Sequence, residues 1–131
     1  MLRVMIVDDD LAILETLQDF ISLLDNLEIV ASASSLPQAL ALLEEIDLDL
    51  LITDLHIANE SGLNLANKFR AKREGGFVII MTASADPSDQ SNALSAGIDI
   101  FLSKTSLVTD LIGAIDQAQA AIFQPSTHSL I

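Results

Sequence analysis

The stretch Leu50-Leu51-Ile52-Thr53-Asp54 is an aliphatic run that ends in a carboxylate, and Gly62 follows eight positions later. A second run, Val4-Met5-Ile6-Val7, ends in Asp8-Asp9-Asp10. Short continuous apolar runs are typical of parallel strands that are buried on both faces. Carboxylates from two such strands are costly to place together, because like charges repel and burial favours the neutral form. Such a cluster indicates a divalent-cation site, a site of chemistry, or both.

The rest of the chain alternates between similar runs and segments with helical spacing. Aliphatic runs lie at about 2–7, 27–32, 49–53, 77–81 and 98–102. Apolar stripes of helical period lie between and after them, at Leu14, Leu17, Ile21 and Leu24, at Leu36, Leu40 and Leu43, at Leu63, Ala66 and Phe69, and at Leu111, Ile115, Ala118 and Ile122. This alternation predicts a doubly wound α/β domain of five βα units, with a parallel sheet covered by helices on both faces.

Local signals mark where the predicted helices begin and end. Ser35 with Gln38 fits a capping box, and Asp86-Pro87 places an N-cap before a proline at the first helical position. Gly75-Gly76 and Gly97 are helix stops. We therefore expect one domain over residues 1–123. Residues 124–131 are expected to be a C-terminal tail or the start of a linker to an output domain.

Composition excludes several classes of function. The 131 residues contain no cysteine, which excludes disulfides and thiolate chemistry. The net charge of −13 argues against direct nucleic-acid binding and against anionic membranes. No apolar stretch approaches the ~20 residues of a membrane span, and no signal peptide is recognisable, so we expect a cytoplasmic protein.

Four of the six basic residues crowd into one stretch: Lys68, Arg70, Lys72 and Arg73. They fit a solvated helix face whose last turn favours cations. A docking patch for an acidic partner is the alternative.

Polar side chains follow four of the five predicted strands. Asp8 and Asp9 follow the first, Asp54 the third, Thr82 the fourth and Lys104 the fifth. In open α/β sheets ligands bind outside the carboxyl ends of the strands. Carboxylates supply hard oxygen ligands for Mg²⁺, while a hydroxyl and an ammonium group can contact a phosphoryl group. The set predicts phosphoryl transfer, in which positioning and charge neutralisation do most of the catalysis.

The chain resembles the receiver domain of two-component response regulators, the family of the bacterial chemotaxis regulator. The resemblance covers about residues 1–123 and is carried by four motifs: Val7-Asp8-Asp9-Asp10, Asp54-Leu55 with Gly62, Met81-Thr82-Ala83, and Phe101-Leu102-Ser103-Lys104. It implies the flavodoxin-like fold with strand order 2-1-3-4-5. It also implies Mg²⁺ as cofactor and a sensor histidine kinase as partner.

Roles for individual residues follow from the resemblance. Asp54 would be the phosphoacceptor. Mg²⁺ would be bound by Asp9, by Asp8 largely through water, by Asp54 and by the backbone carbonyl of His56. The phosphoryl group would be bound by Lys104, Thr82 and the backbone of Ala83. Thr82 and Phe101 would act as the switch, and His56 and Ser84 would tune dephosphorylation.

Each assignment has a structural alternative. Asp8, Asp9 and Asp10 could cap the first helix, with Asp10 best placed to do so. Asp54 could be a turn residue, and Thr82 a strand-end threonine. Lys104 could be a solvated lysine before a helix, and Phe101 plain core. His128 has no expected role.

Three positions depart from the family pattern. Ala58 stands where proline is common, and we expect a more mobile loop with altered metal affinity. Thr105 stands where proline usually follows the lysine through a cis bond, which costs about 2.5–4 kcal/mol before other residues. Phe101 stands where tyrosine is frequent and cannot hydrogen-bond.

The sequence therefore predicts a phosphorylation-dependent switch that catalyses only its own phosphorylation and dephosphorylation. Its modified form would alter partner binding, or dimerisation through the first and fifth helices or through the face of the fourth helix, fifth strand and fifth helix. A transcriptional output domain is the expected target. The alternatives are an unphosphorylated pseudo-receiver and an aspartyl-nucleophile phosphatase. His56 speaks against the phosphatase, because those enzymes favour a second aspartate at that position.

Overall fold

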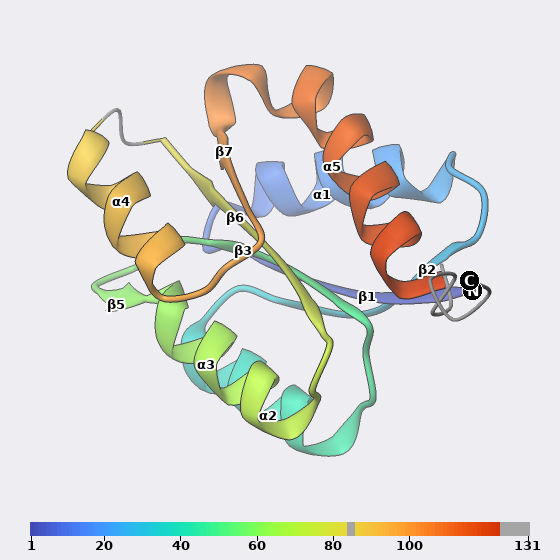
Figure 1. The fold of residues 1–131 in the computed structure, drawn as a ribbon, viewed down its shortest axis with the longest axis horizontal. Coiled ribbons are helices and arrows are strands. Elements are labelled where there is room, and N and C mark those ends of the chain that lie inside the picture. The colour runs from blue at the N-terminus through green and yellow to red at the C-terminus, as the bar shows by residue number, and fades with distance from the viewer. Residues whose placement is uncertain (84–85, 124–131) are drawn as a thin grey trace, which may run out of the picture.

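The computed structural model describes residues 1–83 and 86–123, which form a five-stranded parallel sheet between two layers of helices (Figure 1). The strands of this sheet are β1 (Leu2–Val7), β2 (Leu27–Ala33), β3 (Leu50–Asp54), β6 (Phe77–Thr82) and β7 (Ile100–Ser103). A separate two-stranded antiparallel hairpin is formed by β4 (His56–Ile57) and β5 (Glu60–Ser61). The helices are α1 (Leu11–Ser22), α2 (Leu36–Glu45), α3 (Gly62–Lys72), α4 (Pro87–Ser95), the short 3₁₀ helix η1 (Lys104–Ser106) and α5 (Leu107–Phe123).

The order of the main strands is β2-β1-β3-β6-β7, so the predicted order 2-1-3-4-5 is confirmed. In register, Ile6 pairs with Ile52 and Ile52 with Ile79 across the central strands. Chain order reverses beside β1, which is the position where open α/β sheets bind ligands. The carboxyl ends of β1 and β3 therefore meet at this switch point.

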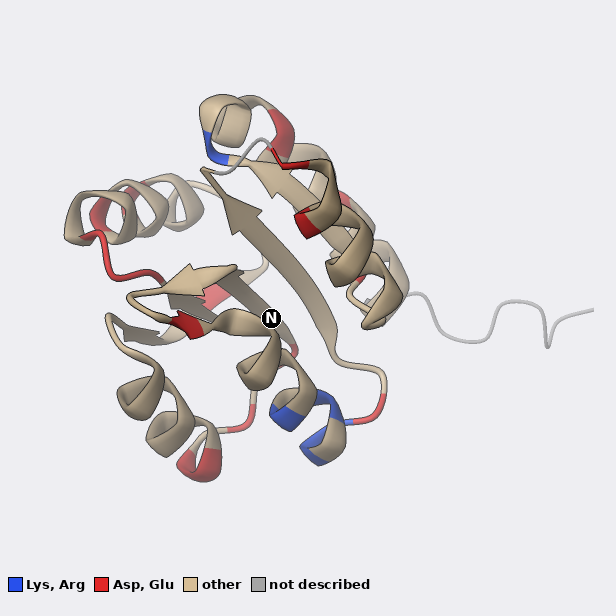
Figure 2. Ribbon diagram, turned by 90° about the vertical axis from the view of Figure 1, so that its left-hand side faces the viewer, with Lys and Arg blue, Asp and Glu red and all other residues tan. Residues whose placement is uncertain are grey.

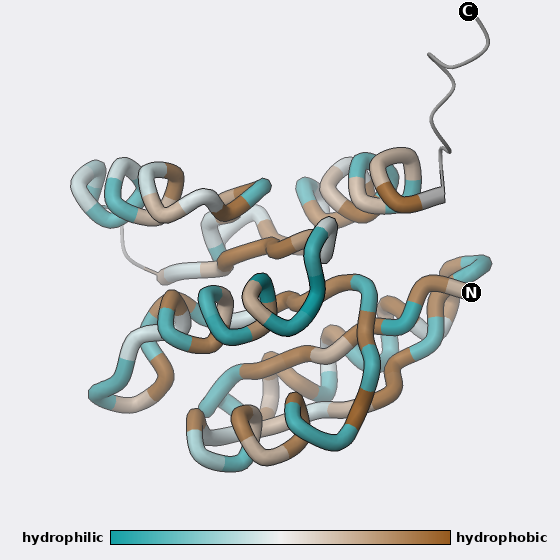
Figure 3. Tube along the Cα trace, turned by 60° about the horizontal axis from the view of Figure 1, so that its bottom comes forward, coloured by the Kyte–Doolittle hydropathy of each residue, from teal (hydrophilic) through white to brown (hydrophobic). Residues whose placement is uncertain are grey.

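Two apolar cores lie on opposite faces of the sheet. One packs α1 and α5 against side chains such as Ile6 and Ile52, and the other packs α2, α3 and α4 against Val7 and Leu51. In Figure 3 the hydrophobic segments follow the strands, while the helices alternate between hydrophobic and hydrophilic positions. Neighbouring strand residues thus point into different cores, which explains why the strands read as continuous apolar runs.

The two predicted N-caps are confirmed by hydrogen bonds, whereas α3 ends at Lys72, three residues before the predicted stop at Gly75-Gly76. Ser35 Oγ accepts from the Gln38 amide at 3.2 Å, and Asp86 Oδ1 accepts from the Ser88 amide at 2.9 Å. Gly97 has φ +88° after α4. Ile98 is buried in the turn that follows, so β7 begins later than the apolar run suggests.

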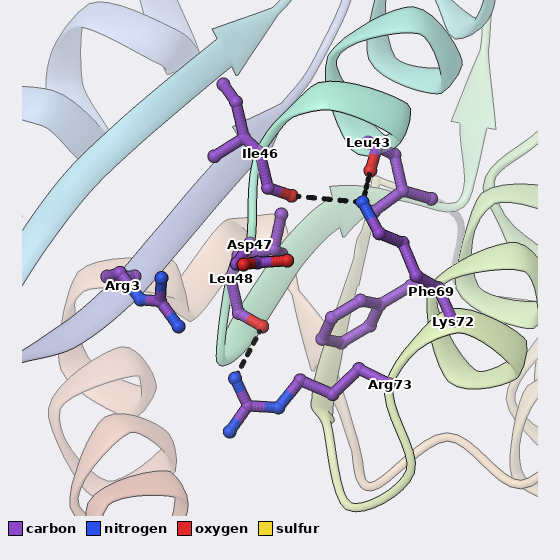
Figure 4. Close-up of a pocket in the computed structure, with 8 residues that line it drawn as sticks. All are labelled: Arg3, Leu43, Ile46, Asp47, Leu48, Phe69, Lys72 and Arg73. Carbon is purple, nitrogen blue, oxygen red and sulfur yellow. Dashed lines mark hydrogen bonds between the residues drawn. The ribbon is translucent and has the colours of Figure 1, made fainter.

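Most of the basic side chains of residues 68–73 make hydrogen bonds or ion pairs within the molecule. Lys72 Nζ donates to the Leu43 and Ile46 carbonyls that end α2, and Arg73 donates to the Leu48 carbonyl at 3.0 Å (Figure 4). These groups line a hollow of about 210 Å³ at the amino-terminal edge of the sheet. Arg70 pairs with Asp99.

Asp49, directly before β3, is the carboxylate that pairs with the arginines at this edge. It is buried, accepts a hydrogen bond from the Arg3 amide at 2.8 Å, and pairs with the Arg73 guanidinium. Burial acts to raise its pKa, but the Arg3 amide and the positive charges of Arg73 and Arg3 outweigh burial and hold the pKa of Asp49 below its ordinary value. The charged stretch therefore fastens α3 to the start of β3.

Two further expectations concern the C-terminal tail and membrane-spanning segments. Residues 124–131, the expected tail or linker, are outside the described residues. Among the helices of residues 1–83 and 86–123, none combines the length and apolarity that crossing a membrane requires.

Candidate functional site

Three carboxylates meet where β1 and β3 end. Asp8 and Asp9 follow β1, and Asp54 is the last residue of β3. One oxygen of each lies within 4.8 Å of an oxygen of the others. Asp8 is fully buried and Asp54 is 6% exposed, whereas Asp9 is exposed. The predicted cluster therefore exists, with one face open to solvent.

Lys104 supplies the positive charge of the cluster. It begins η1, and its Nζ lies 2.6 Å from Asp8 Oδ2 and 3.0 Å from Asp54 Oδ2. Burial opposes the charged ammonium, but the two carboxylates more than compensate, and the pKa of Lys104 is raised. The described residues contain no cis peptide bond, so Lys104-Thr105 is trans and the lysine reaches both carboxylates from a trans backbone.

Burial and the neighbouring charges also shift the pKa of Asp8. Burial raises the pKa of its carboxyl group above the ordinary value, and the neighbouring charge of Asp54 adds to the rise. The Lys104 ammonium and the Asp10 amide act in the opposite direction. The single positive charge of Lys104 does not fully neutralise the two carboxylates of Asp8 and Asp54. The remaining negative charge would therefore stabilise a second cation beside them.

The three consecutive aspartates, residues 8–10, make different contacts. Asp10 is the N-cap of α1, and its Oδ1 accepts from the Ala12 amide at 3.0 Å and the Ile13 amide at 3.4 Å. Asp8 Oδ1 accepts from the Asp10 amide at 2.9 Å. Helix capping is thus satisfied by Asp10, as predicted, and does not account for Asp8 and Asp9.

Gly62 is required by the backbone behind Asp54. A Cβ atom on Gly62 would lie 2.1 Å from the Asp54 carbonyl oxygen, and the Gly62 amide donates to the Leu55 carbonyl at 2.7 Å. The buried Thr53 hydroxyl donates to the same Asp54 carbonyl at 3.0 Å. Close contact with α3 therefore fixes the backbone that carries the Asp54 carboxylate.

The loop after β3 folds over the open side of the cluster as the β4–β5 hairpin. The His56 amide donates to Asp54 Oδ1 at 3.3 Å, and the Ala58 amide donates to Asp9 Oδ2 at 3.0 Å. The His56 side chain is exposed, as expected, and its Nε2 lies 3.6 Å from Asp89 Oδ2 at the start of α4. Sequence reasoning missed the hairpin, because its strands have only two residues each. It also missed the Ala58 amide, because any residue other than proline supplies a backbone N–H.

The remaining predicted residues lie around this edge. Thr82 ends β6 and is buried, one residue beyond Met81, the register partner of Asp54. Ala83 follows it and is exposed. Phe101, in β7, is half-buried and packs against the core beneath α2, α3 and α4. Ser84 is outside the described residues, so its role stays a prediction.

The donor set fits Mg²⁺. It offers carboxylate oxygens from three residues at mutually short distances and keeps an exposed side where water and a phosphoryl group could approach. Mg²⁺ favours oxygen ligands and retains several waters. Figure 2 shows acidic segments on several parts of the molecule, while two of the basic segments lie together on α3.

Comparison with known proteins shows the family and the fold of the chain. Residues 4–116 match the response regulator receiver domain. Nitrate/nitrite response regulator protein NarL of Escherichia coli K12 is 30% identical over 117 residues, which are 89% of this chain and 54% of that protein. The chain spans about half the length of the curated relatives it matches.

Solved structures show the same fold. A CheY-like response regulator receiver domain protein from Methanospirillum hungatei JF-1 superposes with a TM-score of 0.81 at 25% identity, over 95% of this chain and 98% of that one. The signal receiver domain of the putative response regulator NarL from Mycobacterium tuberculosis gives 0.80 at 26% identity, over 90% and 96%.

Proposed function

The chain belongs to the response regulator receiver domain family, and on this premise we propose that Asp54 accepts a phosphoryl group from a sensor histidine kinase. The observation that carries the proposal is the cluster itself. Asp8, Asp9 and Asp54 converge within 4.8 Å, and Lys104 spans Asp8 and Asp54. A structural role does not require so costly an arrangement, because Asp10 alone caps α1.

In the proposed reaction an oxygen of Asp54 attacks the phosphorus of a phosphohistidine. The P–O bond forms, the P–N bond breaks, and the leaving imidazole retains the electron pair and takes up a proton. Mg²⁺, held by Asp8, Asp9, Asp54 and the His56 carbonyl, would neutralise charge on the phosphoryl oxygens. The Asp54 carboxylate is already oriented by the His56 amide, which reduces the reorganisation needed for attack.

Lys104 has a second role after transfer. In the unmodified protein its ammonium contacts both Asp8 and Asp54. An acyl phosphate on Asp54 would carry its charge further from the backbone, and the lysine can follow it on a flexible stem. Thr82 and the Ala83 amide would then contact the phosphoryl oxygens, with Phe101 repacking in the space behind Thr82. His56 and Ser84 would control access of water to the acyl phosphate.

The modified domain would act by changing its contacts with partners. Val108 and Ile112, one helical turn apart on α5, are 51% and 46% exposed, and Leu11 at the start of α1 is 68% exposed. Apolar side chains at these positions support dimerisation through α1 and α5, with the α4–β7–α5 face as the other candidate. By analogy with the NarL-type relatives, the output would be a transcriptional domain elsewhere in the protein.

Phosphotransfer tests the proposal. The wild type and an Asp54→Asn variant are incubated with acetyl phosphate, and separately with a phosphorylated histidine kinase, with and without Mg²⁺. We expect incorporation only in the wild type with Mg²⁺. No incorporation from either donor would favour a pseudo-receiver. Steady hydrolysis of a phosphate ester would instead favour a phosphatase.

A further inference from the structure

The turn of the β4–β5 hairpin contains an alanine in a conformation that alanine rarely adopts. Ile57 pairs with Glu60, so Ala58 and Asn59 form a two-residue loop, and Ala58 has φ +57°. Two-residue hairpin loops place positive φ where glycine is favoured, because a Cβ atom crowds the backbone there. Such a conformation persists only where surrounding contacts fix it, and it often marks a functional site.

The contact that fixes Ala58 is a hydrogen bond to a carboxylate of the cluster. Its N–H donates to Asp9 Oδ2 at 3.0 Å, across 49 positions of sequence. Asp8 and Asp54 both contact the Lys104 ammonium, whereas Asp9 has no ion pair within residues 1–83 and 86–123. A hydrogen bond from an amide to an ionised carboxylate is stronger than one between neutral groups. The exposed Asp9 side chain is thus held by one backbone donor.

The same bond joins two parts of the site. Asp9 lies on the β1–α1 loop, and the hairpin that contains Ala58 also contains His56, whose carbonyl is a proposed ligand. With Oδ2 occupied by the amide, Oδ1 of Asp9 remains available to a cation. We propose that the Ala58 N–H is a positioning group that holds the Asp9 carboxylate and the hairpin in the arrangement that binds Mg²⁺. This inference rests on the proposed function, because it assumes a cation at this cluster.

Ala58→Gly keeps the N–H and removes the Cβ atom, so it should bind Mg²⁺ as tightly as the wild type or more tightly. Ala58→Pro does not isolate the donor, because it removes the N–H and excludes positive φ at the same time, and proline is the common residue of the family at this position. Loss of a group that orients a metal ligand typically weakens binding by about 10–100-fold.

An amide-to-ester replacement at residue 58 keeps the shape of the loop and removes only the donor. Incorporating the α-hydroxy acid that corresponds to alanine should raise the Kd for Mg²⁺ at least about tenfold, or about 1.4 kcal/mol, in calorimetric titrations of the full chain. Thermal unfolding without Mg²⁺ reports any general loss of structure. In the wild type, hydrogen exchange of the Ala58 amide should be slow and should slow further with Mg²⁺.

The outcomes distinguish this inference from the function on which it rests. Equal Mg²⁺ affinity of the wild type and the ester would overturn the positioning role and leave phosphorylation of Asp54 intact. If the wild type itself binds no Mg²⁺, the proposed cation site and the positioning role both fall.

Discussion

A methyl group added at Gly62 should damage the site without changing the side chain of any proposed ligand. Gly62 begins α3 directly behind the Asp54 backbone, and a Cβ atom there would lie 2.1 Å from the Asp54 carbonyl oxygen. Real Cβ contacts do not fall below 3.0 Å, so β3 or α3 must move by about 0.9 Å. The Thr53 hydroxyl, which donates to the same carbonyl, must move with it.

Two costs follow from this displacement. Forcing an additional methyl group into a packed interior costs about 1–3 kcal/mol of folding free energy. A shift of about 1 Å in a reacting group can lower the rate of a reaction about 100-fold. We therefore expect Gly62→Ala to remain folded, with stability reduced by about 2 kcal/mol. Its phosphorylation by acetyl phosphate should be slower by one to two orders of magnitude.

Gly113 provides the matched control. It lies on the exposed side of α5, and a Cβ atom there would have no heavy atom within 4 Å. Gly113→Ala should stabilise the protein by about 0.5–1 kcal/mol, because alanine favours the helix, and should leave phosphorylation unchanged. Urea unfolding followed by circular dichroism measures stability in a chain that has no Trp or Tyr. Wild-type phosphorylation rates in Gly62→Ala would refute the reasoning.

Three further predictions concern the charged groups. Lys104→Met leaves the fully buried Asp8 without its cation, and should lower stability at pH 7 by about 3 kcal/mol. Added Mg²⁺ should restore part of the loss in thermal unfolding, and unchanged stability would contradict the ion pair. Asp49→Asn should cost about 2 kcal/mol at pH 7. The folded-state pKa of Asp49 is lowered from 3.8, so the stability difference between wild type and variant should be fully present above pH 3.8. The difference should disappear as the pH falls through the folded-state pKa, where wild-type Asp49 becomes protonated. A stability difference that persists at low pH would argue against a charge effect. Asp10→Ala should lower the free energy of unfolding by about 1 kcal/mol through loss of the cap, and it should leave Mg²⁺ binding unchanged. A large loss of Mg²⁺ affinity in this variant would show that Asp10 is part of the cation site.

The fold was predictable because its central strands β3 and β6 are buried along their whole length and β1 nearly so. Residues such as Ile6 and Ile52 face one core and Val7 and Leu51 face the other, which leaves few polar positions to interrupt the aliphatic runs of these strands. Strand order came from the family resemblance and is confirmed. Periodicity could not find β4 and β5, because each has two residues and pairs only with the other.

The carboxylate cluster was predictable for a topological reason. Parallel strands present their carboxyl ends at one edge, so Asp8, Asp54 and Lys104 had to lie near one another once the strand order was known. The Lys104 contacts at 2.6 and 3.0 Å agree with that reasoning. Proximity of residue types thus follows from the fold, whereas roles in the reaction remain proposals.

Contacts made by the backbone, or by side chains with several possible partners, were not predictable. The Ala58 amide leaves no mark in the sequence, and its long-range partner Asp9 is fixed only by the path of the hairpin. Arg73 could have been a solvated cation at the end of α3, but the position of the buried Asp49 gives it an internal partner. Such contacts depend on loop geometry, which local propensity does not determine.

Mass-spectrometric identification of the phosphorylated residue tests the central claim most directly. The wild type is phosphorylated with Mg²⁺, reduced with borohydride to convert an acyl phosphate into a stable alcohol, and digested. We predict a single modified residue, Asp54, and no modification in Asp54→Asn under the same conditions. Modification at another residue, or equal incorporation by Asp54→Asn, would contradict the assignment of Asp54 as the phosphoacceptor.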